Sequence, residues 1–125
     1  MITLGDIHGD SRIIHNYLSR GYLNNKTVYQ VGDFGLYDLK TCNLTKSCLE
    51  DIDAHCKDTN TKIRVIRGNH DNPKFWLNDD ERILFNKTYS NIELIPDYHI
   101  ETIDGKSIMF IGGGVCCAER TAVGV

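Results

Sequence analysis

The sequence has no long apolar run, no internal repeat, no low-complexity segment and no excess of positive charge. No stretch approaches the roughly 20 apolar residues of a membrane-spanning helix, and Asp6 and His8 come too early for a secretory signal peptide. The net charge of -3 gives no general attraction to nucleic acid or to an anionic membrane. A phosphate-bearing ligand would therefore need local positive charge, for which bound metal ions are the natural source.

The five cysteines form no C-x-x-C pair, the spacing that is typical of redox and zinc sites. They are Cys42, Cys48, Cys56, Cys116 and Cys117. An odd number of cysteines without secretory features indicates reduced thiols, so we expect a cytoplasmic protein. The 125 residues are 41% hydrophobic and 25% charged, which is ordinary for one globular domain.

The stretch G-D-I-H-G-D at residues 5–10 follows a short apolar run at residues 1–4. We expect the run to be a strand and the stretch to be the loop after it. Because an extended backbone sends alternate side chains to the same side, Asp6 and His8 can converge on one point. Such an oxygen and nitrogen pair binds Mn²⁺, Fe²⁺ or Zn²⁺. An ordinary loop that caps a helix would also fit this stretch.

Two later stretches repeat the arrangement of an apolar run, a glycine and a polar side chain. Asp33 lies in G-D-F-G at residues 32–35, and Asn69, His70 and Asp71 lie in G-N-H-D at residues 68–71. In open α/β sheets, ligands bind at the carboxyl ends of parallel strands. We therefore expect the three loops to meet at one site that holds a metal ion or acts in catalysis.

In this order and spacing, G-D-x-H-G, G-D-x-x and G-N-H-D resemble the motifs of the calcineurin-like metallophosphoesterases, from residue 1 to about residue 120. The resemblance implies a phosphate mono- or diester substrate, two divalent ions (Mn, Fe or Zn) and attack by a metal-bound hydroxide. It also implies that Asp6, His8, Asp33 and Asn69 are metal ligands, with Asp33 bridging the two ions.

The same resemblance assigns the residues that would act on the substrate. His70 is not a ligand and would protonate the leaving oxygen, while Asp71 would orient its imidazole and raise its pKa. Arg67 could reach the phosphate, or it could form a salt bridge at the end of its strand.

Apolar periodicity and turn residues predict an α/β fold. We expect the first βαβαβ half of the calcineurin-like phosphoesterase fold, a β-sandwich flanked by helices, together with one hairpin. The expected helices cover residues 11–22, 41–58 and 74–78, and the expected strands cover residues 1–4, 26–31, 62–67 and 91–95. The hairpin would join residues 98–103 to residues 107–111 through Asp104-Gly105, a strong turn signal.

Apolar residues at helical spacing should lie on one face of each of the longer helices. Ile14, Tyr17 and Leu18 would share one face of the first helix, which Asp10 or Ser11 would cap. On the second helix the buried residues would be Leu44, Cys48, Ile52 and Cys56.

The family pattern continues with a lone metal-binding histidine and then Gly-His-x-His, and this sequence matches neither motif. One ligand of the first metal and two of the second are therefore absent. We expect a domain over residues 1–125 that is truncated at its C-terminal side, leaves apolar sheet surface uncovered and binds one metal ion weakly or none.

Two hypotheses follow for the function. In the first, the chain is a metallophosphoesterase whose activity needs the missing half, supplied for example by a separate polypeptide. In the second, it is a non-catalytic remnant that binds a divalent metal or a phosphorylated partner. A phosphoprotein, a nucleotide and a nucleic acid all stay open as substrates, and the scattered basic residues argue against a nucleic-acid-binding module.

Overall fold

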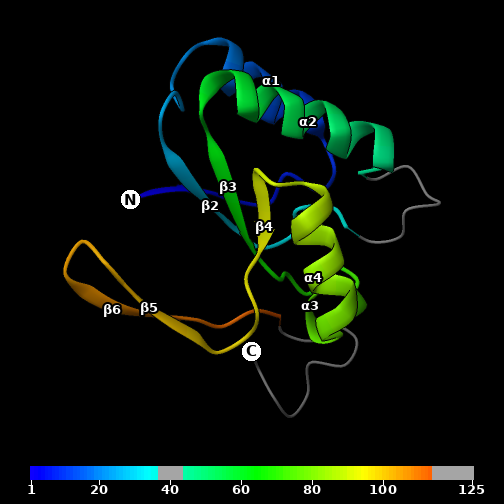
Figure 1. The fold of residues 1–125 in the computed structure, drawn as a ribbon, viewed down its shortest axis with the longest axis vertical. Helices are drawn as coiled ribbons and strands as arrows, with labels where there is room; N and C mark the ends of the chain where they lie inside the picture. The colour runs from blue at the N-terminus through cyan, green and yellow to red at the C-terminus, as the bar shows by residue number, and fades with distance from the viewer. Residues whose placement is uncertain (37–43, 114–125) are drawn as a thin grey trace.

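The computed structural model describes residues 1–36 and 44–113. Within these residues, helices cover one face of a parallel four-stranded sheet and a β-hairpin lies on the other face (Figure 1). The predicted α/β class, with its first βαβαβ half and one hairpin, is confirmed. The sheet has the order β1-β2-β3-β4, formed by β1 (Ile2–Leu4), β2 (Thr27–Val31), β3 (Lys62–Ile66) and β4 (Ile92–Leu94).

The strands of the sheet lie in register and run in the same direction. Ile2 pairs with Val28, Val28 with Ile63, and Ile63 with Ile92, so equivalent positions that pack in or against the core lie side by side. The segments that follow β1, β2 and β3 therefore leave the sheet at the same edge. This edge is where the candidate ligands of the sequence are located.

Helix α1 (Ser11–Ser19) begins as expected but ends earlier than residue 22. The Asp10 carboxylate accepts a hydrogen bond of 3.1 Å from the Arg12 amide and so caps the first turn. Just beyond the last turn, Gly21 has a φ of +77°, which is typical of the glycine that follows a helix end. Ile14 and Leu18 are buried, but Tyr17 is 38% exposed, so the face that these three residues share is only partly buried.

Helix α2 (Lys46–Thr59) starts later than the predicted residue 41. The Thr45 hydroxyl accepts a hydrogen bond of 3.3 Å from the Cys48 amide, which places the cap after Leu44, while residues 37–43 lie outside the described residues. Its buried positions are Leu49, Ile52 and Cys56, and Cys48 is only half-buried. Burial raises the pKa of the Cys56 thiol to about 12, as expected for a packing residue.

Two helices connect β3 to β4, and the sequence predicted only the first. Helix α3 (Lys74–Leu77) packs Phe75 and Trp76 inward, whereas α4 (Asp79–Thr88) buries only Phe85 and leaves Ile83 and Leu84 about 60% exposed. With one buried residue, α4 lacks the apolar periodicity that reveals a helix.

Among the described residues, no helix is long and apolar enough to cross a bilayer.

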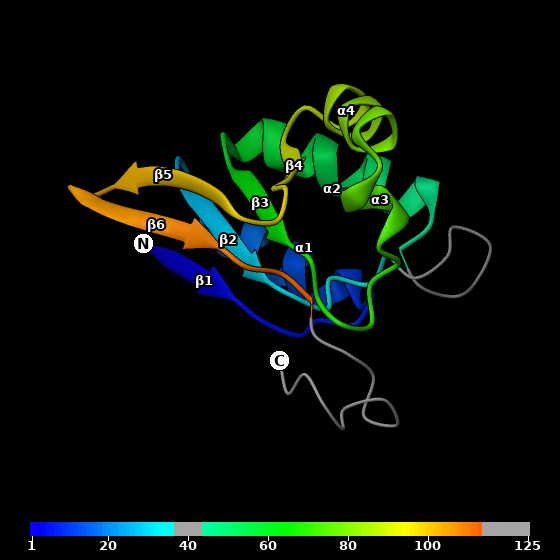
Figure 2. The same cartoon turned by 90° about the horizontal axis from the view of Figure 1, so that it is seen from below.

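The predicted hairpin is confirmed, with β5 (His99–Ile103) antiparallel to β6 (Lys106–Phe110). Figure 2 shows it on the side of the sheet away from α1 and α2. Tyr29, Ile95 and Phe110 form a small buried cluster between the hairpin and the sheet. Large apolar side chains nevertheless stay half or more exposed on the hairpin and at its end, namely Ile100, Met109 and Ile111. The described residues thus leave apolar side chains exposed on the hairpin and at its end.

A pair of histidines joins α1 to α2. The Nδ1 atoms of His15 and His55 are 2.8 Å apart, and the two rings are nearly parallel, with 21° between their planes. Only one of the two nitrogens can carry a proton in such a hydrogen bond. Burial lowers the pKa of His15, and the nearby His55 lowers it further, whereas Asp51 acts in the opposite direction.

We expect this pair to make stability depend on pH. Because the pKa of His15 is lower in the folded protein than the unfolded value of about 6.5, the unfolded chain binds more protons between the two values. Stability should therefore be full above pH 6.5 and fall as the pH is lowered through this window. Urea unfolding from pH 5 to 8 should show a shallower dependence for His15→Gln, and an unchanged dependence would contradict this account.

Candidate metal centre

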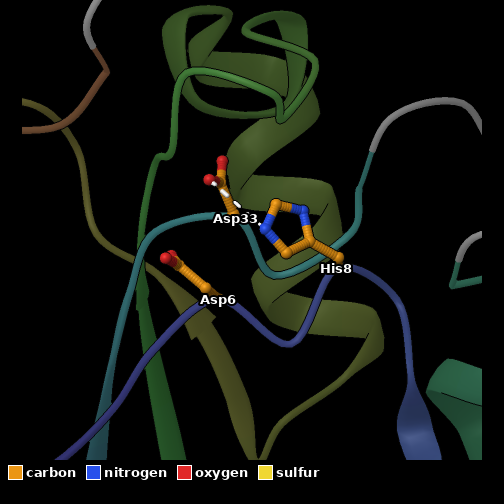
Figure 3. Close-up of side chains that lie close together, drawn as sticks. All are labelled: Asp6, His8 and Asp33. Carbon is orange, nitrogen blue, oxygen red and sulfur yellow. Dashed lines mark ion pairs between the residues drawn. The ribbon is translucent and has the colours of Figure 1, made fainter.

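Three loops meet at the carboxyl edge of the sheet: the first loop (residues 5–10), the second loop (residues 32–36) and the third loop (residues 67–72). Asp6, His8 and Asp33 each offer a ligand atom, and these atoms all lie within 4.8 Å of one another. Figure 3 shows the two carboxylates and the imidazole gathered at one place. The structure thus brings these three side chains together as expected, while their role as ligands stays a prediction.

The backbone reaches this arrangement in a way that the sequence did not indicate. Asp6, His8 and Asp33 have positive φ angles of 44°, 48° and 49°, which lie in the left-handed region. The expected extended backbone with alternating side chains is therefore wrong for Asp6 and His8. Aspartate and histidine are enriched in this region among non-glycine residues, and such conformations cluster at functional sites.

The first two loops are held together by backbone contacts. The His8 amide donates to the Asp33 carbonyl at 2.9 Å, and the Gly9 amide donates to the Phe34 carbonyl at 3.0 Å. Gly35 has a φ of +112°, and a Cβ there would overlap the backbone of Gly9. The loops can approach this closely only because residue 35 has no side chain.

The third loop lies equally close to the second. A Cβ on Gly68 would overlap the backbone and the carboxylate of Asp33. The His70 amide donates a hydrogen bond of 3.1 Å to Asp33 Oδ1, and the other oxygen, Oδ2, lies 3.8 Å from His8 Nε2. The buried Asp33 carboxylate thus touches both neighbouring loops, which suits a group that is expected to bridge two ions.

Asn69 and His70 lie on the accessible side of the third loop. Asn69 lines a groove of about 600 Å³ together with Asp6 and Asp33. The exposed His70 ring is centred 5.8 Å from the ring of His8, so it lies beside the candidate ligands. Both residues are therefore placed near Asp6, His8 and Asp33, although their assigned roles stay predictions.

Asp71 does not have the partner that was expected. Asp71 is 3% exposed, and its carboxylate accepts hydrogen bonds from four backbone amides, those of Phe34, Gly35, Leu36 and Gly68. Among the described contacts, no hydrogen bond joins it to the His70 ring. Burial raises the pKa of the Asp71 carboxyl, and the four amide donors act against this rise. The role of Asp71 in orienting the His70 imidazole stays a prediction, which no described hydrogen bond supports.

Arg67 forms a salt bridge at the end of its strand, which is one of the two roles expected for it. Its Nη2 atom forms a salt bridge of 2.8 Å with Asp97 Oδ2, and only 15% of the Arg67 side chain is exposed. Arg67 also lines the groove. A contact with phosphate would have to compete with this salt bridge.

The sequence signals did not reveal how the loops are joined. The glycines at the strand ends were visible in the sequence, but their close contacts with Gly9 and Asp33 involve residues more than 20 positions apart. The four amide partners of Asp71 also come from two separate loops. No local pattern could have identified these contacts.

Comparison with protein families agrees with the site. The sequence model of the calcineurin-like phosphoesterases matches residues 2–121, a range that includes all three loops. A search of curated proteins found no match.

We expect Gly35→Ala to lower the free energy of unfolding by about 3 kcal/mol or more. A positive φ costs an alanine about 1–2 kcal/mol, and displacing the Gly9 backbone adds a further 1–3 kcal/mol. Gly105→Ala is the matched control, because its φ is also positive, at +77°, but nothing lies within 4 Å of the added Cβ. Urea unfolding of both variants measures the difference, and equal losses would contradict the close contact between the loops.

Proposed function

Because the chain belongs to the calcineurin-like phosphoesterase family, we propose that it is a metal-dependent phosphoesterase that hydrolyses a phosphate mono- or diester. The observation that carries this proposal is the convergence of Asp6, His8 and Asp33, whose ligand atoms lie within 4.8 Å of one another. Carboxylate oxygen and imidazole nitrogen suit Mn²⁺, Fe²⁺ and Zn²⁺, so the donor set fits the metals of the family. We favour Mn²⁺ as the first ion to test.

The proposal gives each residue of the site a role. Asp6, His8 and Asp33 would hold one ion, and Asn69 would join Asp33 at a second. When bound, such ions offset the charge of the phosphate and lower the pKa of a water ligand towards neutrality. The site would otherwise be unfavourable for phosphate, because Asp6 and Asp33 are acidic and Arg67 is already paired with Asp97.

We assign the transfer of a proton to His70. Its exposed ring lies beside His8, where it can face a bound ester, and no described hydrogen bond joins it to the Asp71 carboxylate. As a general acid, His70 would hold a proton and give it to the leaving oxygen as the ester bond breaks. The backbone amide of His70, which is bonded to Asp33, would keep the ring near the reacting atoms.

We also propose that full activity requires a further polypeptide segment. The Gly-His-x-His motif of the family is not in this sequence, and Ile100, Met109 and Ile111 are exposed on the hairpin side of the sheet. We propose a separate polypeptide that carries this motif as the partner that supplies the remaining ligands and covers these side chains. We further propose that the protein is located in the cytoplasm, because its odd number of cysteines suits reduced thiols.

The second candidate function is binding without turnover. It is supported by the small number of ligands, because Asp6, His8 and Asp33 are the one group of three or more ionisable ligand residues within the described part of the chain. In this case the site would hold a divalent ion or a phosphorylated partner. Measurements of metal binding and of hydrolysis together distinguish the two functions.

We expect Mn²⁺ to stabilise the folded protein through this site. An ion present at about 100 times its dissociation constant should raise the free energy of unfolding by about 2.7 kcal/mol. Asp33→Asn should remove most of this effect, because Asp33 contributes one of the three clustered ligand atoms. Asp79→Asn serves as the control, since Asp79 is exposed and pairs with Arg82 on α4. Thermal unfolding with and without Mn²⁺ measures the shift, and an equal shift in Asp33→Asn and the unaltered protein would place the ion elsewhere.

We expect slow, Mn²⁺-dependent hydrolysis of p-nitrophenyl phosphate or of its bis ester. Asp33→Asn should reduce the rate at least about 100-fold, because the barrier to phosphate-ester hydrolysis is very high without the ions. Asp79→Asn should keep the rate of the unaltered protein. Binding of Mn²⁺ without any hydrolysis would favour the second function, and the absence of both would refute the proposal.

A further inference from the structure

Among the described carboxylates at the candidate metal centre, that of Asp71 is the most buried, with 3% exposed against 8% for Asp33. Its Oδ1 atom accepts hydrogen bonds from Gly35 and Leu36, at 3.0 and 3.1 Å. Its Oδ2 atom accepts from Gly68 and Phe34, at 2.9 and 3.3 Å. An ionised carboxylate has about four lone-pair positions, so these amides use its whole capacity as an acceptor.

The donors belong to the two loops that carry candidate ligands. Those of Phe34, Gly35 and Leu36 follow directly after Asp33, and that of Gly68 directly precedes Asn69. One carboxylate therefore spans from the second loop to the third. Hydrogen bonds to ionised groups are stronger than those between neutral groups, which makes this link stronger than one backbone contact.

Further contacts between the same two loops depend on this link. The Asn72 amide donates to the Leu36 carbonyl at 2.7 Å, and the His70 amide donates to Asp33 Oδ1 at 3.1 Å. Asn72 and His70 flank Asp71 in the chain, so a displacement of Asp71 would disturb both bonds. The second of them orients the Asp33 carboxylate itself.

We propose that Asp71 is a positioning residue, which joins the second and third loops so that Asp33 and Asn69 lie at the distance required to hold metal ions. This proposal rests on the metal-dependent function proposed above. It differs from a role in proton transfer, because Asp71 acts here through the backbone and not through the His70 ring. Residues that support metal ligands in this way typically change metal affinity 10- to 100-fold when they are altered.

Asp71→Asn tests this proposal with little change in shape. An asparagine has one oxygen acceptor, and its NH₂ group would face amide donors, so at most two of the four hydrogen bonds can form. Asp53→Asn is the matched control, because Asp53 Oδ1 also accepts a hydrogen bond of 2.8 Å from a backbone amide, that of Asn91. Asn91 directly precedes β4, so this bond lies at the edge of the sheet opposite the three loops. An asparagine at position 53 keeps its oxygen acceptor.

The first measurement begins with the unaltered protein. Hydrogen exchange followed by NMR in the metal-free protein should show slow exchange for the amides of Gly35, Leu36 and Gly68, because they are bonded to a buried carboxylate. If these amides exchange as fast as those of an exposed turn, the proposal is overturned. Asp71→Asn should speed their exchange at least tenfold and leave the β5–β6 hairpin unchanged.

The second measurement is Mn²⁺ affinity by calorimetry. We expect Asp71→Asn to weaken binding 10- to 100-fold, and Asp53→Asn and His70→Ala to change it less than threefold. If Asp71→Asn keeps the affinity and loses only hydrolysis, as His70→Ala should, then Asp71 acts through the His70 ring and the proposal is wrong. If the unaltered protein binds no Mn²⁺, the proposed function fails, and hydrogen exchange alone decides the role of Asp71.

Discussion

The close contact of three loops at one edge of the sheet is the constraint on which the rest of the site depends. In-register parallel strands bring the loops to the same edge, but they do not bring side chains within the reach of one ion. That step requires backbone to pack directly against backbone. Gly35 against Gly9, and Gly68 against Asp33, provide this contact, since neither position has room for a Cβ.

This packing also accounts for the unusual backbone of the candidate ligands. Asp6, His8 and Asp33 each have a positive φ, a conformation that costs energy and persists only when the surroundings hold it. The hydrogen bonds from the His8 and Gly9 amides to carbonyls of the second loop hold the first and second loops together. Contacts between the loops therefore hold the three candidate ligand side chains in place.

The sequence predicted those parts of the fold that depend on local pattern. The Asp104-Gly105 turn identified the hairpin, and Asp10 marked the start of α1. Where tertiary contacts decide, the predictions were less accurate. Tyr17 shares a helical face with Ile14 and Leu18 but is 38% exposed, because it borders a surface pocket between α1 and β1. Helix α4 was missed because it buries only Phe85.

The sequence by itself determined which chemistry the site can have. The residue types and the glycines at three strand ends are enough to indicate a metal centre and the family of the protein. The tertiary structure alone decided how the residues are used. Asp71 follows His70 in the chain, yet it binds amides of two loops, one of them about 36 positions away. A carboxylate satisfies the nearest donors in space, and only the folded chain determines which donors those are.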